Sequence, residues 1–520
     1  MTFPSSLPAS ARVCFSSAFI GLDDIVAIAC RRAAVALSDE PVFTDAIHRC
    51  AALMERILKE DGVIYGVTTG YGDSCQTSIP PELVSELPHH LVAYHGCGLG
   101  QYFTPEQTRA ILAVRLTSLC KACSGVRLTL LETLVKLLQS DILPLIPSEG
   151  SVGASGDLTP LSYLAAVLCG EREVLTEAGI QNATEALQHA GIAPLRLAPK
   201  EGLALMNGTA AMTGLACLAY ARAEYLTRLT ARITAFAASA LNSNHGHFDE
   251  ILFAMKPHRG MQDTANRIRR DLLISDRPAG RNSERIQDRY SIRCAPHVIG
   301  VLADALPWMR QSIENELNSV NDNPVFDVEG GRVLHGGHFY GGHIAFAMDS
   351  MKNAVANLAD LMDRQMALLV DARYNNGLPA NLTGAEAPRN CINHGVKALQ
   401  ISVSAWTAEA LKLTMPASVF SRSTECHNQD KVSMGTIAAR DCVRVLELTE
   451  QVAAALLITV RQAISLRDSM GQHTSLHPQT QAMLDELAAS IPFLDEDRRL
   501  DHDLRHMLKC IRSCQWVLYE

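Results

Sequence analysis

Residues 150–161 read GSVGASGDLTPL, and the tripeptide at their centre can make its own reactive group. In a tightly bent Ala-Ser-Gly tripeptide, the amide nitrogen of Gly156 can attack the carbonyl carbon of Ala154. Loss of water from the new ring and of the Ser155 hydroxyl leaves a five-membered imidazolone with an exocyclic methylene, the electrophile 4-methylidene-imidazole-5-one (MIO). Glycine suits the attacking position because it has no Cβ to obstruct the bend. The three residues alone also fit an ordinary turn of small side chains, so the prediction depends on the longer string.

That longer string closely resembles the prosthetic-group segment of the aromatic amino acid ammonia-lyases, the family of histidine, phenylalanine and tyrosine ammonia-lyases. The resemblance extends from about Val13 to about Leu466. It implies a carbon–nitrogen lyase whose cofactor is MIO, formed autocatalytically from Ala154, Ser155 and Gly156. It implies no external cofactor and no metal.

Composition places the chain among globular proteins. Apolar residues make up 48% of its 520 residues, which is enough for a large core. The net charge of −9 comes without a block of like charges, which argues against nucleic acid and membranes as partners. We find no signal peptide and no run of about eighteen apolar residues, so we expect a soluble, cytoplasmic protein.

The fifteen cysteines are scattered along the chain rather than arranged in a framework. Cys120 and Cys123 form the only C-x-x-C pair, in an apolar helical stretch without nearby histidines. This context favours buried free thiols over a zinc or redox site, and free thiols suit a reducing compartment.

Helix signals dominate the sequence. Thr104, Pro105 and Gln107 have the pattern of a capping box with proline at the first helical position. An apolar stripe at three- to four-residue spacing, made of Val355, Leu358, Met362, Met366 and Leu369, predicts one face of a long buried helix. A second long helix is predicted over 438–466, whereas strand signals are short, as at 13–19 and 333–334.

The predicted fold is therefore mainly α: a long central helical bundle with a smaller mixed N-terminal region that carries the MIO loop. Prolines and charges between Leu195 and Glu201 separate two apolar regions. We expect an N-terminal domain over 1–198, with the MIO loop and a lid loop, and a helical bundle domain over 199–520.

Residues 65–72, YGVTTGYG, form a glycine-rich segment of the kind that serves as a mobile lid. The resemblance implies that this loop covers the substrate and that Tyr65 is the catalytic base. An ordinary phenol has a pKa of about 10, and lowering it by two or three units needs about 3–4 kcal/mol. Helix N-termini could supply part of that stabilisation.

Residues 287–294, QDRYSIRC, resemble the second tyrosine motif of the family. The resemblance implies that Arg293 holds the substrate carboxylate, since a guanidinium can bind both oxygens in a fixed fork. It implies further that Tyr290 assists proton transfer near the prosthetic group and that Gln287 orients the substrate.

Three further positions match the family. Asn207, in the segment 201–208, is assigned to polarising the electrophile, although a buried asparagine also often satisfies backbone groups. Asn323, within 321–324 (NDNP), is a substrate-side candidate, with a turn-forming role as the alternative. Phe339 matches an aromatic residue that packs near the ring. His338 departs from the family, which usually has asparagine there, so no role is assigned to it.

Substrate choice in the family is governed by two neighbouring positions, here Tyr94 and His95, and by the segment 427–435. Histidine lyases resemble this chain at His95, but they usually have glutamate at the position of Gln429, whose neutral amide resembles the phenylalanine and tyrosine branch. Asn428 is a further candidate for substrate binding. His95 could bond a phenol hydroxyl, and a site built for that bond rejects the analogue without it.

These residues predict conversion of L-tyrosine to trans-4-coumarate and ammonia. The alternatives are phenylalanine ammonia-lyase, histidine ammonia-lyase and a tyrosine or phenylalanine 2,3-aminomutase. The resemblance implies a homotetramer whose active sites are shared between chains, with a small aromatic amino acid as the other partner. A helical scaffold without chemistry and a fumarase-like lyase are the rivals from other classes.

Overall fold

The structure is a computed structural model that describes residues 12–60, 62–274, 286–473 and 475–519. It divides into two compact units, each drawn from separate stretches of the chain. Unit 1 comprises residues 1–221, 309–349 and 416–440, and unit 2 comprises residues 222–308, 350–415 and 441–520. The predicted division at 198/199 is a single point in the chain, unlike these interleaved units, and it stays a prediction.

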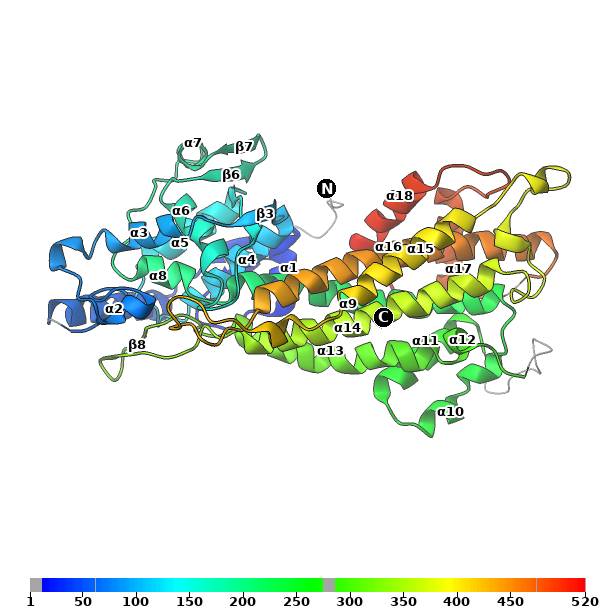
Figure 1. Cartoon of the computed structure of the whole chain (residues 1–520), viewed down its shortest axis with the longest axis horizontal. Helices are drawn as coiled ribbons and strands as arrows, with labels where there is room; N and C mark the ends of the chain where they lie inside the picture. The colour runs from blue at the N-terminus through cyan, green and yellow to red at the C-terminus, as the bar shows by residue number, and fades with distance from the viewer. Residues whose placement is uncertain (1–11, 61, 275–285, 474, 520) are drawn as a thin grey trace. The chain divides into compact units, whose positions relative to one another are not determined.

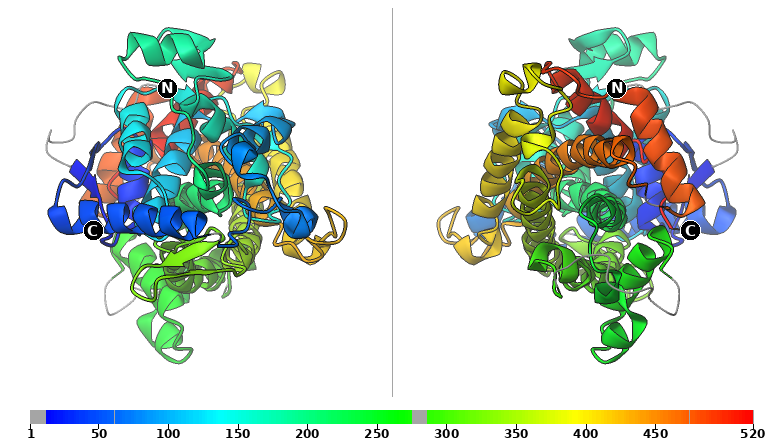
Figure 2. Two further views of the ribbon diagram at one scale, coloured as in Figure 1. Left: turned by 90° about the vertical axis from the view of Figure 1, so that its left-hand side faces the viewer. Right: turned by 90° about the vertical axis from the view of Figure 1, so that its right-hand side faces the viewer.

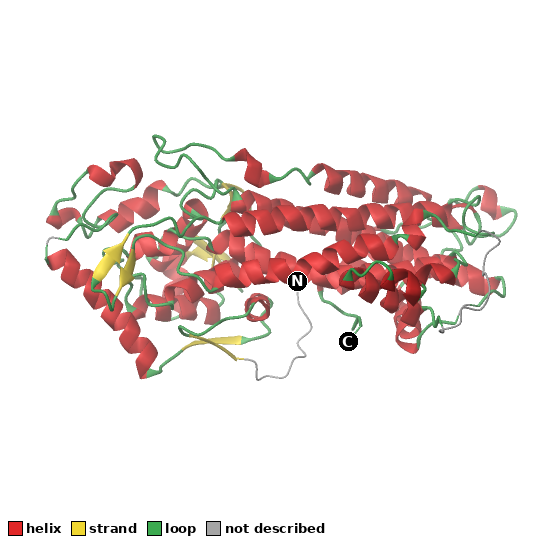
Figure 3. Ribbon diagram, turned by 90° about the horizontal axis from the view of Figure 1, so that it is seen from below, coloured by secondary structure: helices red, strands yellow, loops and turns green. Residues whose placement is uncertain are grey.

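Helices predominate in both units, as the sequence predicts (Figure 3). Four long helices have residues in each unit: α9 (Ala210–Ala240), α13 (Ala295–Leu317), α14 (Gly342–Val370) and α16 (Gly435–Ser469). Their labels are found in Figure 1. The predicted stripe from Val355 to Leu369 lies on α14, and all five of its side chains are buried. The predicted helix over 438–466 is confirmed within α16.

Unit 1 is mixed, with short strands between its helices. Its helices are α1 (Leu22–Ala29), α2 (Pro41–Lys59), α3 (Leu87–Tyr94), α4 (Pro105–Leu119), α5 (Leu128–Gln139), α6 (Leu158–Leu168), α7 (Ala183–His189) and α8 (Glu201–Met206). Its strands are β1 (Arg12–Phe15), β2 (Ala34–Leu37), β3 (Leu99–Tyr102), β4 (Leu143–Pro144), β5 (Pro147–Glu149), β6 (Glu173–Thr176), β7 (Gly179–Asn182), β8 (Val325–Asp327) and β9 (Arg332–Leu334).

These strands form small sheets. β1 pairs with β2 in parallel, while β3–β5, β4–β6–β7 and β8–β9 are antiparallel. Helix α7 lies beside the β6–β7 hairpin (Figure 2). The strand predicted over 13–19 ends earlier, at Phe15, where the Ser16 hydroxyl accepts a hydrogen bond from the Ala18 amide and so favours a turn. The prediction around 333–334 is confirmed as part of β9.

The capping box predicted at Thr104 is confirmed and begins α4. Its hydroxyl accepts from the amide of Gln107, and the Gln107 side chain accepts from the amide of Thr104.

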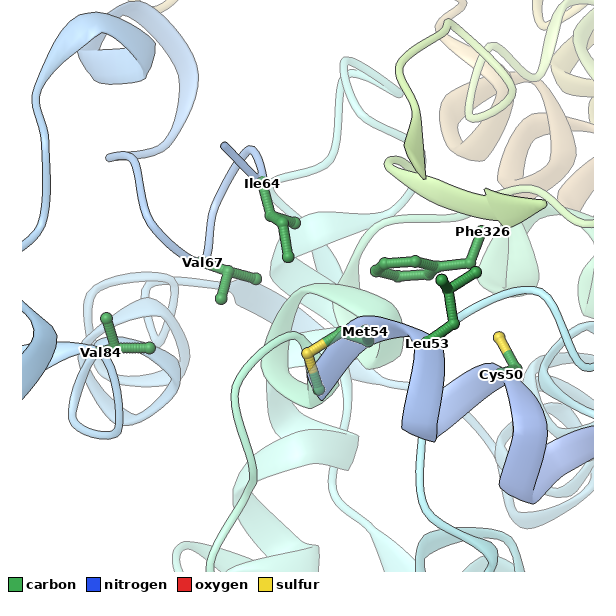
Figure 4. Close-up of a cluster of buried hydrophobic side chains, with 7 residues drawn as sticks. All are labelled: Cys50, Leu53, Met54, Ile64, Val67, Val84 and Phe326. Atoms are coloured by element: carbon green, nitrogen blue, oxygen red, sulfur yellow. The ribbon is translucent and has the colours of Figure 1, made fainter. Parts of the chain in front are cut away.

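A buried apolar cluster packs the β8 strand and the start of the lid segment against α2, through Cys50, Leu53, Met54, Ile64, Val67, Val84 and Phe326 (Figure 4). This cluster fixes the base of the segment that carries Tyr65.

Unit 2 is helical apart from its loops. Its own helices are α10 (Glu250–Ala254), α11 (Arg259–Asp271), α12 (Tyr290–Arg293), α15 (Lys397–Lys412), α17 (Pro478–Ser490) and α18 (Asp501–Arg512). The short 3-10 helix η3 (His245–Phe248) precedes α10. Among the described residues, no helix is long and apolar enough to cross a membrane.

Candidate active site

The predicted prosthetic-group segment is the loop between β5 and α6 in unit 1. Ala154 and Gly156 pair as an isolated bridge across Ser155, so the tripeptide is bent back on itself. Gly156 has φ +69°, in the left-handed region that favours glycine. The bend that cyclisation requires is thus present in the fold of the loop.

The loop is packed so closely that Gly156 has no room for a side chain. A Cβ there would overlap the carbonyl oxygen of Gly208. The same two strands of backbone are bonded together, because Gly208 N donates to Ser155 O (3.3 Å) and Asp157 N donates to Gly208 O (2.7 Å). The Asn207–Gly208 turn therefore holds the tripeptide from one side.

Asp157 anchors the other end of the loop. Its side chain is fully buried, and its carboxylate accepts from Met212 N (2.9 Å), Ser151 Oγ (3.3 Å) and Thr436 Oγ1. Met212 lies in the first turn of α9, where backbone amides lack helical partners. Burial raises the Asp157 pKa to about 6, and the bonded hydroxyls and amides oppose that shift.

Asn207 precedes Gly208 in the turn that is bonded to the tripeptide, and its side chain is buried. The residue is 3% exposed, and its backbone oxygen accepts from Arg115 Nη1 (3.0 Å). Its side-chain oxygen Oδ1 is buried without a hydrogen-bond partner among the described residues. A buried acceptor of this kind needs a hydrogen-bond donor to complete it. The fit of this loop to the MIO group that the sequence predicts rests on the bend across Ser155 and on the lack of room for a side chain at Gly156.

Gln429 contacts Ser155 directly. Its Nε2 donates to Ser155 Oγ (3.4 Å), and its Oε1 accepts from Thr424 Oγ1 (2.7 Å). Thr424 and Gln429 also pair through their backbones, which closes a tight loop. Within that loop Glu425, Cys426 and His427 have φ of +51°, +52° and +67°. Such a run of non-glycine residues is strained, and strain of this kind collects at functional sites.

The lid segment is held against that strained loop. Glu425 Oε1 accepts from Asp73 N (2.8 Å), and Tyr65 Oη accepts from the neighbouring amide of Gly72 (2.7 Å). Burial raises the pKa of Tyr65, the Gly72 amide opposes the shift, and the Glu425 charge adds to it. The surroundings of Tyr65 in unit 1 therefore raise its pKa, whereas a tyrosine that acts as a catalytic base needs a lowered pKa.

Tyr94 and His95 end α3. Their rings lie 4.3 Å apart between centroids, and Tyr94 is 57% exposed. His95 Nδ1 lies 2.9 Å from Leu91 O, so Nδ1 carries the proton and Nε2 is left as an acceptor. Burial lowers the His95 pKa, which favours this neutral form. Burial, Tyr65 and Glu425 together raise the Tyr94 pKa to about 12, so these side chains belong to one neighbourhood.

The remaining unit 1 candidates lie on loops. Asn323 Oδ1 accepts from Gly336 N (2.8 Å) and so shapes the loop that carries the half-buried Phe339. Asn428 donates its backbone amide to Glu425 O (2.9 Å) and exposes its side chain. These contacts account for loop conformation, and the substrate-binding roles of all three residues stay predictions.

Gln287, Tyr290 and Arg293 belong to unit 2. Tyr290 begins α12 and is 71% exposed, and the Arg293 guanidinium lies 4.6 Å from the centre of its ring. Arg293 Nε donates to Asp288 O (3.0 Å). The structure thus gathers the other predicted catalytic residues within unit 1 and these three within unit 2.

Three groups around the loop are not indicated by the sequence patterns as functional. Asp157 lies within residues 150–161, but two of its partners, Met212 and Thr436, are distant in sequence. Arg115 is a fully buried arginine whose pKa burial lowers to about 10, and its position in an apolar helix was the available signal. Glu425 lies just before the segment 427–435. Among the described residues, no cluster of histidine, cysteine and carboxylate side chains could hold a metal ion.

The chain is similar to known proteins over most of its length. The pattern of the aromatic amino acid lyases matches residues 20–489. Histidine ammonia-lyase of Gloeobacter violaceus is 36% identical over 493 residues, 94% of each chain. The crystal structure of histidine ammonia-lyase from Trypanosoma cruzi has TM-score 0.87 and 30% identity, covering 97% of this chain and 94% of that one.

Tyrosine aminomutase from Streptomyces globisporus is similar too, with TM-score 0.88 and 32% identity, covering 97% of this chain and 98% of that one. The relatives named histidine ammonia-lyase give no support to the predicted tyrosine specificity. The family pattern covers most of the chain, and the relative from Gloeobacter violaceus is 36% identical over 94% of it. This chain is an enzyme of the aromatic amino acid lyase family.

Proposed function

We propose that the chain eliminates ammonia from an aromatic L-amino acid by means of MIO formed from Ala154, Ser155 and Gly156, and that L-histidine is its substrate. The observation that carries the chemistry is the bent Ala154–Gly156 tripeptide, with Gly156 at φ +69° and no room there for a side chain. The choice of histidine is supported by relatives of that name at 36% identity over 94% of the chain.

The group supplies an electrophilic carbon to which an amine can add, and that makes the amine a better leaving group. Around it, Asn207 provides a polar contact, and Gln429 lies beside the Ser155 side chain. Tyr65 removes the β-hydrogen, and Arg293 binds the carboxylate through a two-point contact. Tyr290 assists proton transfer, and Gln287 orients the substrate.

Ring recognition in this proposal depends on His95. Because its Nδ1 is directed at the Leu91 carbonyl, Nε2 is the ring nitrogen that can accept a hydrogen bond from the substrate. Imidazole offers an N–H to this acceptor, and phenol offers an O–H. The phenyl ring of phenylalanine offers neither, and it would leave the acceptor unpaired at a cost of about 1–3 kcal/mol. His95 therefore favours histidine or tyrosine over phenylalanine.

L-tyrosine is the second candidate, and Gln429 is the observation in its favour. The neutral amide lacks the charge with which a carboxylate would bind an imidazolium. Gln429 therefore supports conversion of L-tyrosine to trans-4-coumarate. An aminomutase would use the same residues and would return ammonia to the β-carbon.

The test is incubation of the purified protein with L-histidine, L-tyrosine and L-phenylalanine, with absorbance spectra for urocanate, coumarate and cinnamate. Chromatography for β-amino acids detects the mutase reaction in the same samples. Ser155→Ala is the control, since it removes the hydroxyl that MIO formation expels. Near-ultraviolet absorbance above the aromatic band that persists in Ser155→Ala would count against MIO.

We propose further that the enzyme is a homotetramer with active sites shared between chains and that it works in the cytoplasm. Shared sites predict complementation. Tyr65→Phe and Arg293→Met, each inactive alone, would regain up to about a quarter of wild-type activity when co-expressed and randomly mixed. If both residues of a site come from one chain, the mixture stays inactive.

A further inference from the structure

The segment that carries Gln287 and Arg293 is bonded to the turn before α10 in unit 2. Asn244 N donates to Asp288 Oδ2 (2.7 Å), and Asn244 Nδ2 donates to Ile286 O (3.1 Å). Asn244 is also the N-cap of η3, where its side chain accepts from Gly246 N. One asparagine thus ties a rigid turn to the segment 286–289.

His247, on the same turn, holds the next peptide group. Asp288 N donates to His247 Nε2 (2.9 Å), a bond that requires Nε2 without a proton. The carbonyl oxygen of Asp288 accepts from Arg293 Nε (3.0 Å). Asp288 therefore links the two side chains through its backbone: its amide is fixed by His247, and its carbonyl fixes Arg293.

These contacts determine the direction of the Arg293 guanidinium. Nε is directed at Asp288 O, and the guanidinium lies 4.6 Å from the Tyr290 ring centre. With Nε bonded to Asp288 O, the terminal nitrogens are the donors available for a two-point contact with a carboxylate. Arginine binds carboxylates best when its fork is held in this way.

We propose that His247 is a positioning residue for Arg293, which in its neutral form fixes the Asp288 peptide and so aims the guanidinium at the substrate carboxylate. This rests on the proposed role of Arg293. His247 does not touch substrate in this scheme, and its effect is on substrate binding through Arg293.

Protonation of His247 would convert Nε2 from acceptor to donor. The ring would then lose the Asp288 amide and pair with the Asp288 carboxylate, which is already 3.4 Å away. Within the part of the chain that the structure describes, the charged groups that act on His247 are Asp288 and Arg293. Burial lowers the His247 pKa, Asp288 opposes the shift, and Arg293 adds to it. The pKa of His247 is therefore lower than that of an ordinary histidine, and the side chain is neutral above it. Binding of the substrate carboxylate is expected to weaken as the pH falls through this pKa.

The experiment measures kcat and KM between about pH 5 and 8 for the wild type, His247→Gln and His247→Ala. Glutamine keeps an acceptor that does not titrate, and alanine removes it. The control is His258→Gln, an exposed histidine of the same unit. Circular dichroism verifies that each variant is folded.

We expect His247→Ala to raise KM by about 3- to 10-fold at neutral pH, the effect of one hydrogen bond, with kcat within about twofold. His247→Gln should keep the neutral KM and show a smaller acid rise than the wild type, the remainder coming from His95 and the substrate imidazole, whereas His258→Gln should show the full wild-type rise. An unchanged KM in His247→Ala, or an acid rise in His247→Gln as large as that of the wild type, would overturn the proposal.

A readout without turnover separates this inference from the proposed function. A crystal structure of His247→Ala should show the bond between Arg293 Nε and Asp288 O lost or displaced, and an intact bond would overturn the inference. If the wild type converts no aromatic amino acid, the proposed function fails, and the crystal structure still decides the role of His247.

Discussion

The carboxylate of Glu425 accepts a hydrogen bond from the backbone amide of Asp73 (2.8 Å), across 352 positions of sequence. The adjacent amide, of Gly72, donates to the Tyr65 hydroxyl (2.7 Å). A strained loop thus places a negative charge beside the residue proposed as the base. That charge disfavours the phenolate, so it works against the function of Tyr65 unless it is neutralised when substrate binds.

Glu425→Gln should therefore shift the pH profile. Glutamine keeps an acceptor for the Asp73 amide and removes the charge, so the Tyr65 pKa falls. Because the base acts when deprotonated, we expect the rising limb of kcat/KM to move to lower pH by up to about one unit. The measurement is kcat/KM against pH, with Glu82→Gln, an exposed carboxylate on the 3-10 helix η2 (Pro81–Leu83), as the control. A rising limb that does not move would argue against Tyr65 as the titrating base.

Much of the local structure follows from the sequence because its causes are local. The cap at Thr104 needs only residues three positions away, and the stripe from Val355 to Leu369 needs only helical periodicity. The bend at Gly156 is likewise encoded in a tripeptide.

The rest depends on contacts that no local pattern records. Glu425 meets Asp73, and Asp157 meets Thr436, only because distant segments fold together. Each compact unit is built from three separate stretches of chain, an arrangement that no local sequence pattern records. The acceptor state of His95 follows from its contact with Leu91, and sequence alone does not specify which nitrogen is protonated.

Gly156→Ala should prevent formation of the prosthetic group. The new Cβ would overlap the carbonyl oxygen of Gly208, and φ of +69° adds about 1–2 kcal/mol of backbone strain. Gly191→Ala is a matched control, because Gly191 has φ +67° but nothing within 4 Å of a Cβ. We expect Gly191→Ala to lose about 1–2 kcal/mol and keep full activity per folded enzyme. Gly156→Ala should lose more stability, the near-ultraviolet band and turnover, and retention of that band would contradict the packing argument.

Gln429→Glu should shift the preference of the enzyme toward histidine. A carboxylate at this position can accept a charge-assisted bond from imidazolium, which is worth about 1.5–3 kcal/mol. We expect the ratio of kcat/KM for histidine over tyrosine to rise about tenfold or more at a pH where the substrate imidazole is charged. Gln400→Glu, on α15, makes the same chemical change at a distant position in the chain and should leave the ratio unchanged. An unchanged ratio would place the substrate ring away from Gln429.

Asp157 should make stability depend on pH in an unusual direction for a carboxylate. Its folded pKa of about 6 lies above the ordinary value, so its contribution is full below about pH 4 and is lost as pH rises through about 6. The loss amounts to about 3 kcal/mol for a shift of this size. In Asp157→Asn the amide oxygen can accept from the Met212 amide, and the rotatable hydroxyls of Ser151 and Thr436 can accept from the amide nitrogen.

The difference in unfolding free energy between wild type and Asp157→Asn isolates this group from the other titrating residues. We expect the wild type to lose stability relative to Asp157→Asn from pH 4 to pH 8, by about 3 kcal/mol, measured by denaturant unfolding. Asp157→Ala should be destabilised by about 3–5 kcal/mol throughout, because it leaves the amide and both hydroxyls without their acceptor. If the wild type instead gains stability over the asparagine variant as pH rises, the hydrogen-bond donors around the carboxylate stabilise its charged form more than burial opposes it, and the anchor works in its charged form.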